Sequence, residues 1–259
     1  MQVKRLAEMV SERSGRRVAK LVRIERGSQS VNFAGTREDG SRFALKLVPF
    51  RREKQYARLV EHLEKIDSPV VVRETVPRVR FDFEGHHVLS LEWCGGEIVP
   101  FDRLFDAISP ERFLDGYRRF SESVQRVSRL YPSAQTGFRE LDSGRIVIHG
   151  DWQADNLRFS EGRLVHVLDV EELRLGRPVE DFVRYAACSF GHLPFFAFAR
   201  RSRIVGNLAR LAEVSGFSSG EWVAALRASM AERLRKRRRF GVGRWMRFYG
   251  ELERRVSGR

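Results

Sequence analysis

The hydrophobic pattern of this chain changes its period once, at about residue 93. Before that point, short runs alternate apolar and polar residues between Gly or Asp-Gly breaks, which is typical of antiparallel strands. Beyond it, apolar residues mostly recur every three or four positions, which is typical of helices. The sequence therefore predicts an α+β protein of two lobes, β-rich over residues 1–93 and α-rich over residues 94–259.

The individual elements follow from these patterns and from the residues that interrupt them. In the first lobe we expect a helix at 3–12, strands at 18–24, 31–36 and 41–48, a helix at 51–66, and a hairpin of residues 76–83 and 87–93. In the second lobe we expect helices at 113–130, 179–190, 203–214, 221–240 and 245–256, with a non-helical stretch at 146–175.

Composition places the chain among globular proteins. Hydrophobic residues make up 42% and charged residues 32% of the 259, which is too apolar for a disordered chain. The only cysteines are Cys94 and Cys188, so we expect neither a disulfide framework nor a cysteine-built zinc site. Residues 1–20 lack the apolar segment of a signal peptide, and no apolar run reaches the roughly 18 residues of a membrane span. We therefore expect a cytoplasmic protein.

The chain is strongly basic. Its formal net charge is +14, and six of its 48 basic residues are lysine, so 42 are arginine. Such a charge favours anionic partners, either a phosphorylated or membrane-bound substrate or a nucleic acid. Arginine is also well tolerated on a solvated face, so the excess is equally consistent with a coding bias.

The residues that carry chemistry gather in the non-helical stretch of the second lobe. Two short apolar runs bracket a loop that contains Asp151 and Asn156, and Asp169 ends the second run. Phosphoryl transfer requires a carboxylate that orients the acceptor hydroxyl and hard oxygen donors that hold Mg²⁺ against the nucleotide phosphates. Asp151 suits the first role, and Asn156 and Asp169 suit the second. The sequence contains neither a Gly-x-Ser-x-Gly nor a His-Glu-x-x-His motif, which argues against a triad hydrolase and a metalloprotease.

Three motifs in order extend this pattern. They are His149-Gly150-Asp151 with Asn156, then Leu168-Asp169-Val170-Glu171, then Gly176-Arg177-Pro178-Val179-Glu180-Asp181. The sequence resembles the aminoglycoside phosphotransferase and choline kinase superfamily, although Val170 stands where that family often has Trp. The resemblance implies a protein-kinase-like two-lobe fold and an ATP- and Mg²⁺-dependent kinase with an alcohol acceptor. It further implies that Asp151 is catalytic, that Asn156 and Asp169 bind the metal, and that Asp181 braces the catalytic loop. We expect His149 to be structural.

The resemblance extends into the first lobe. Lys46 stands where the family carries the lysine that grips the nucleotide phosphates, and Glu53 is the expected partner of its ammonium group. Glu61 on the same predicted helix is the alternative partner. The resemblance also implies nucleotide contacts from the loop residues Gly27, Ser28 and Ser30 and from the hinge-strand residues Glu92 and Cys94.

The acceptor is not encoded in any of these motifs. Arginines at 200, 201 and 203 and from 233 to 239 favour an anionic acceptor, such as a sugar of a lipid-linked glycan, and raise the possibility of association with a membrane surface. An aminoglycoside-type antibiotic kinase is the alternative, and the arginines of 233–239 could simply solvate a packed helix. A non-catalytic kinase-fold module is disfavoured because the four expected polar residues of the site are all present. A nucleic-acid-binding protein is disfavoured because the aromatic run before Arg200 is apolar enough to be buried.

Overall fold

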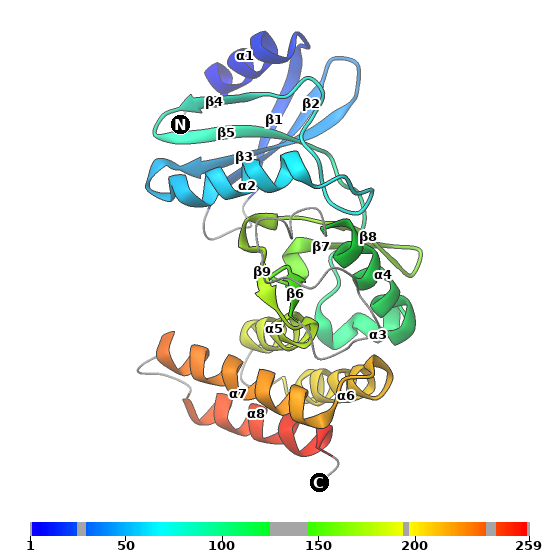
Figure 1. Cartoon of the computed structure of the whole chain (residues 1–259). Coiled ribbons are helices and arrows are strands. Elements are labelled where there is room, and N and C mark those ends of the chain that lie inside the picture. The colour runs from blue at the N-terminus through cyan, green and yellow to red at the C-terminus, as the bar shows by residue number, and fades with distance from the viewer. Residues whose placement is uncertain (1, 25–29, 125–144, 194–196, 237–241, 258–259) are drawn as a thin grey trace. The chain divides into compact units, whose positions relative to one another are not determined.

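A computed structural model describes residues 2–24, 30–124, 145–193, 197–236 and 242–257 (Figure 1). The chain divides into two compact units, Met1–Gly95 and Gly96–Arg259. The first unit is built on an antiparallel sheet and the second is mostly helical, which confirms the predicted α+β class.

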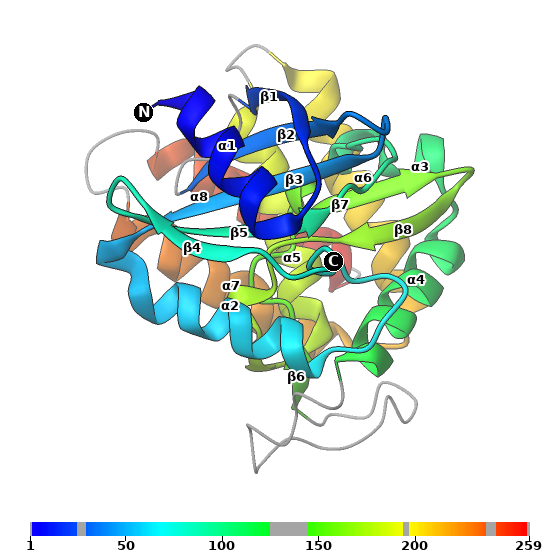
Figure 2. The same cartoon turned by 90° about the horizontal axis from the view of Figure 1, so that it is seen from above.

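The first unit contains a five-stranded antiparallel sheet in the order β1-β2-β3-β5-β4. Because side chains alternate across a strand, Phe43, Leu45 and Leu47 of β3 face the same side, where they form one core with Leu6 and Val10 of α1. Figures 1 and 2 show α1 and α2 on opposite sides of this sheet. The elements are α1 (Val3–Ser14), β1 (Val18–Ile24), β2 (Val31–Arg37), β3 (Arg42–Pro49), α2 (Glu53–Lys65), β4 (Arg80–Phe83) and β5 (His86–Glu92).

One strand of this sheet is shorter than predicted. The alternating pattern predicted a strand from residue 76, whereas β4 begins at Arg80. Pro77 has no backbone N–H to give to a neighbouring strand, so the segment before β4 does not pair along its length. Its backbone still contacts β5 at single points, where Ser90 donates its N–H to the Val79 carbonyl at 3.1 Å.

The second unit contains helices and two small β-ribbons. Strand β6 pairs with β9, and β7 pairs with β8, so the four strands form the non-helical stretch that the sequence predicted. Buried aromatic rings of Tyr117, Trp152 and Phe182 join α4, the loop after β6 and α5. The elements are α3 (Leu104–Ala107), α4 (Pro110–Ser123), β6 (Ile146–Ile148), β7 (Leu157–Ser160), β8 (Arg163–Val167), β9 (Arg174–Gly176), α5 (Pro178–His192), α6 (Phe198–Ser215), α7 (Ser219–Lys236) and α8 (Val242–Val256).

Several helices of the second unit begin or end at other residues than predicted. Helix α6 begins at Phe198, five residues before the predicted start at 203. Helix α4 is described to Ser123, and the remainder of the predicted helix, from 125 to 130, lies outside the described residues. Residues 237–240, the predicted end of the helix expected at 221–240, also lie outside the described residues. The same holds for part of the aromatic run before Arg200.

Candidate active site

A sharp turn follows strand β6, and glycine alone fits its centre. Gly150 has φ of +76°, and a Cβ at this position would lie 2.3 Å from the carbonyl oxygen of Glu172. A side chain would therefore be both strained and sterically blocked. The turn directs the following residue, Asp151, away from β6 and towards α5.

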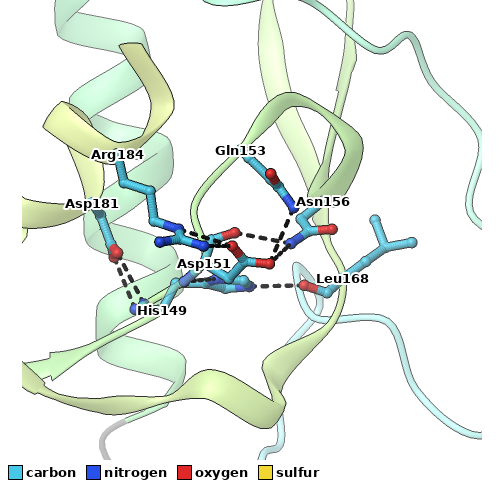
Figure 3. Close-up of polar contacts among 8 residues, drawn as sticks. His149, Asp151, Gln153, Asn156, Leu168, Asp181 and Arg184 are labelled. Carbon is cyan, nitrogen blue, oxygen red and sulfur yellow. Dashed lines mark hydrogen bonds and ion pairs between the residues drawn. The ribbon is translucent and has the colours of Figure 1, made fainter. Parts of the chain in front are cut away.

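The backbone of this turn is held by a buried carboxylate on α5. Asp181 accepts hydrogen bonds from the backbone N–H of His149 at 2.8 Å and of Gly150 at 2.9 Å (Figure 3). It also accepts one from the hydroxyl of Tyr117 at 2.9 Å. Burial raises the pKa of Asp181, and the nearby His149 and these donors oppose that rise. Burial also raises the pKa of Tyr117, and the negative charge of Asp181 raises it further. The bracing role implied for Asp181 is thus visible in its contacts.

His149 serves the backbone of the same loop. Its Nε2 lies 2.8 Å from the Leu168 carbonyl oxygen and its Nδ1 lies 3.2 Å from the Asp151 N–H. These contacts fix one tautomer, because a carbonyl oxygen accepts and an N–H donates. The ring is fully buried and packs against Phe120 and Trp152, so its contacts are structural, as the sequence suggested.

The Asp151 carboxylate is surrounded by donors from three side chains. Its Oδ2 accepts from Gln153 Nε2 at 3.1 Å and from Asn156 Nδ2 at 3.2 Å. Its Oδ1 accepts from two nitrogens of Arg184, with the Nε at 2.8 Å (Figure 3). Asn156 also donates to the Asp151 carbonyl oxygen at 2.9 Å, which ties the two ends of the loop together.

Arg184 was not anticipated from the sequence. It stands on α5 three residues after Asp181, so the two side chains project from one face of the helix onto the loop. Burial alone would lower the pKa of Arg184, but the adjacent Asp151 carboxylate raises it above its usual value. The Asp-x-x-Arg spacing in a predicted helix was the available signal, but it acquires meaning only once Asp181 is known to face the loop.

Asn156 and Asp169 lie at the same end of the β7–β8 ribbon. Leu157 pairs with Val167 in the ribbon, and the Leu168 N–H donates to the Asn156 carbonyl at 2.8 Å. Asp169 then adopts a left-handed backbone with φ of +58°, an uncommon conformation for a residue other than glycine. The pairing of β7 with β8 thus places the two predicted metal ligands at the same end of the ribbon.

The donor chemistry of this pair fits Mg²⁺. The Nδ2 of Asn156 is used on Asp151, so its side-chain oxygen is the atom suited to a metal, and Asp169 supplies a carboxylate. Two oxygen ligands from the protein, completed by waters and substrate phosphates, are typical of nucleotide-bound Mg²⁺. Among the described residues there is no group of three or more His, Cys, Asp or Glu side chains that could hold a metal without such help.

The expected nucleotide residues of the first unit occupy β3, β5 and α2. Lys46 is 4% exposed on β3, on the face opposite the α1 core, whereas Glu53 is exposed at the start of α2. The alternative partner, Glu61, has its carboxylate 2.7 Å from Lys65 Nζ. The ion pair between Lys46 and Glu53 therefore stays a prediction.

The other expected nucleotide contacts also stay predictions. Ser30 is half-buried just before β2, while Gly27 and Ser28 lie outside the described residues. Glu92 ends β5, and its backbone N–H already donates to the Arg73 carbonyl at 2.8 Å, so its carbonyl oxygen is the backbone atom suited to a ligand. Cys94 follows as a half-buried cysteine that forms no disulfide.

The arginines that suggested an anionic acceptor are in part used by the fold itself. The Nε of Arg200 lies 2.6 Å from the buried carboxylate of Asp102, and Arg203 lies 3.1 Å from Asp106. The guanidinium of Arg201 lies over the ring of Phe190, 5.5 Å from its centroid. Of the second arginine group, Arg235 is exposed, and residues 237–239 lie outside the described part of the chain. Residues 200–203 therefore give weaker support for an anionic acceptor than their sequence suggested.

Comparisons with known proteins agree with this geometry. Residues 100–214 match the model of the phosphotransferase enzyme family. The hygromycin B complex of aminoglycoside phosphotransferase APH(4)-Ia with AMP-PNP is similar in structure, with a TM-score of 0.57, 12% identity and 97% coverage of both chains. APH(3'')-Id from Streptomyces rimosus gives a TM-score of 0.51 at 15% identity and 99% coverage of both chains. Aminoglycoside 2'-phosphotransferase-IIIa gives 0.52 at 10% identity, with 98% of this chain and 99% of that one covered. No curated protein matches the sequence.

The fold and the family match define the class of protein. The chain has the protein-kinase-like fold of the aminoglycoside phosphotransferases, and its catalytic loop lies inside the segment that matches the phosphotransferase enzyme family. The resemblance drawn from the motifs and the fold that it implied are thereby confirmed. No helix among the described residues is long and apolar enough to cross a membrane.

Proposed function

We propose that this chain is an ATP- and Mg²⁺-dependent kinase that transfers the γ-phosphoryl group to a hydroxyl of a small molecule or glycan. The observation that carries the proposal is the arrangement of Asp151, Asn156 and Asp169 around one loop and one ribbon end. The solved structures of similar fold include complexes with ADP, AMP-PNP and GDP, which supports a nucleotide as the donor.

Each residue has a distinct task in this proposal. Asp151 accepts a hydrogen bond from the acceptor hydroxyl, orients it towards the phosphoryl group and receives its proton. Asn156 and Asp169 hold the metal, which when bound neutralises charge on the nucleotide phosphates. Lys46, on β3, is the lysine that we assign to the nucleotide phosphates. Asp181 keeps the loop backbone in place while these contacts form.

Two classes of acceptor are candidates for this kinase. Hygromycin B in a similar structure makes an aminoglycoside-type kinase the second candidate. An anionic sugar or glycan remains our preferred acceptor, because the unit that would receive it is rich in arginine and an aminoglycoside is cationic. An acceptor screen by ADP production separates the two candidates: phosphorylation of aminoglycosides with no response to anionic sugars would favour the second.

Substitution of Asp151 tests the catalytic assignment. Asp151→Asn should lower turnover about 100-fold or more while ATP affinity changes little, because the acceptor side loses its base. Steady-state ADP release and calorimetric titration with Mg²⁺ and AMP-PNP measure the two quantities. Asp155→Asn is the matched control, since Asp155 is exposed in the same loop and the substitution removes the same charge. Equal turnover of the Asp151→Asn variant and the wild type would refute the assignment.

A further inference from the structure

The Asp151 carboxylate has no acceptor site left for a substrate hydroxyl. An ionised carboxylate offers about four lone-pair sites, two on each oxygen. Arg184 occupies both sites of Oδ1, and Gln153 and Asn156 occupy those of Oδ2 (Figure 3). At least one of these donors must therefore leave before an acceptor hydroxyl can bind to the base.

Arg184 is the donor whose departure frees a whole oxygen, because it occupies both sites of Oδ1, whereas Gln153 and Asn156 each occupy one site of Oδ2. Asn156 is 4% exposed and is also held by the Asp151 carbonyl oxygen, so it is fixed at two points. The Arg184 side chain is 30% exposed, next to an Asp151 side chain that is 22% exposed. A long and partly solvated side chain can move without unpacking the core, whereas the buried amide cannot.

The charge of Arg184 decides what can displace it. Separating the guanidinium from Asp151 removes its hydrogen-bonded partner and leaves it with the attraction of Glu232, which is unfavourable unless another anion takes the place of Asp151. A phosphate or carboxylate group on the acceptor would supply that anion and matches the planar fork of arginine. A cationic acceptor would instead be repelled at the position next to the base.

Resting on the proposed function, we infer that Arg184 is a positioning and specificity-determining residue that exchanges Asp151 for an anionic group of the acceptor. In the absence of acceptor, the ion pair occupies the Asp151 carboxylate. Asp151 is then less able to act as a base for a water molecule, and hydrolysis of ATP is limited. When an acceptor with a phosphate or carboxylate near its reacting hydroxyl binds, the guanidinium turns to that group and Oδ1 becomes available to the hydroxyl.

The test compares paired probes on wild type and Arg184→Gln. Glycerol 3-phosphate and glycerol form one pair, and glucose 6-phosphate and glucose form the second. With wild type, the phosphorylated member of at least one pair should raise ADP release about tenfold over its neutral partner. Arg184→Gln should raise ADP release in the absence of any probe, because Asp151 is then open to water, and should lose the difference within each pair. Arg184→Lys should recover part of that difference, since it keeps the charge but not the fork.

Arg227→Gln controls for the loss of one positive charge. Arg227 pairs with Glu253 at the surface, 2.6 Å apart between α7 and α8, and this variant should behave as wild type in every assay. The inference would be overturned if probe-free ADP release in Arg184→Gln were the same as in wild type. It would also be overturned if wild type showed no difference within either probe pair, or if Arg184→Gln kept the difference that wild type shows. The proposed function fails separately, if ATP does not bind or if Asp151→Asn leaves ADP release unaltered.

Discussion

At the scale of the residue, Asp169 combines a charge with a backbone conformation that few residues adopt. Its φ of +58° lies in the left-handed region, which asparagine tolerates better than most side chains. Replacement by alanine would therefore change two things at once, the metal ligand and the backbone strain. Replacement by asparagine removes the negative charge and keeps both the shape and the tolerance of this backbone.

We therefore expect Asp169→Asn to weaken Mg²⁺-dependent nucleotide binding at least tenfold without loss of thermal stability, because an anionic ligand of the metal becomes neutral. Asn156→Ala should weaken binding less, since it removes a neutral oxygen. Calorimetry with AMP-PNP in the presence and absence of Mg²⁺ measures the effect. If Asp169→Asn bound Mg²⁺ and AMP-PNP as tightly as wild type, Asp169 would not be a metal ligand.

At the scale of the element, helix α5 organises the catalytic loop from a single face. Asp181 holds the loop backbone and Arg184, one turn later, holds the Asp151 side chain. The helix is anchored beneath the loop by buried rings, with Phe182 and Tyr117 in edge contact at 4.8 Å between centroids. A change at Asp181 should thus alter the active site although this residue does not contact the substrate.

Asp181→Asn tests this coupling. The substitution keeps the shape but turns one acceptor oxygen into an NH₂ group that faces backbone N–H donors, so at least one buried donor loses its partner. We expect a loss of about 1–3 kcal/mol in the free energy of unfolding, together with a lower kcat and a nearly unchanged KM for ATP. Denaturant titration and steady-state kinetics provide both numbers. A variant as stable and as active as wild type would show that Asp181 does not brace the loop.

The distance along the chain between contacting residues explains which parts of the site could be predicted from the sequence. The candidate site residues Asp151, Asn156 and Asp169 are close together along the chain, and their spacing is set by one loop and one ribbon, so local pattern was sufficient to select them as candidates. Arg184 reaches Asp151 across 33 positions and Arg200 reaches Asp102 across 98, through packing of helices that no local pattern encodes. The shortened β4 was missed because its alternating residues outweighed the effect of one proline.

At the scale of the whole molecule, ion pairs within the chain neutralise part of the positive charge. Arg80 contacts Glu74 and Glu64 in the first unit, and Arg200 and Arg227 contact acidic residues in the second. The surface pair of Arg227 and Glu253 contributes at most about 1 kcal/mol, whereas Glu74 and Asp102 are buried carboxylates that depend on their arginine partners. The net charge of +14 means that basic residues outnumber acidic ones by 14 over the whole chain, so internal pairing cannot neutralise all of them.

The stability of the second unit should fall steeply in alkali. Burial raises the pKa of Tyr117, with a further contribution from Asp181, and burial likewise raises the pKa of Tyr185. In the unfolded chain both hydroxyls lose their protons near pH 10, whereas in the folded unit they keep them. Proton release therefore favours the unfolded state: the stabilisation is complete below pH 10 and is lost as pH rises towards the folded pKa values.

Each of the two tyrosines should lower the free energy of unfolding by about 1.4 kcal/mol per pH unit above pH 10. Tryptophan fluorescence reports this transition, because Trp152, Trp222 and Trp245 are all buried in the second unit. Tyr185→Phe should remove about half of the alkaline slope. Tyr117→Phe should do the same. Both variants should start from a lower stability at neutral pH, because Tyr117 loses its hydrogen bond to Asp181 and Tyr185 loses its hydrogen bond to the Val99 carbonyl oxygen. Denaturant titrations from pH 8 to 11 test both, and a slope that neither substitution reduces would mean that these hydroxyls ionise as freely in the folded unit as in the unfolded chain.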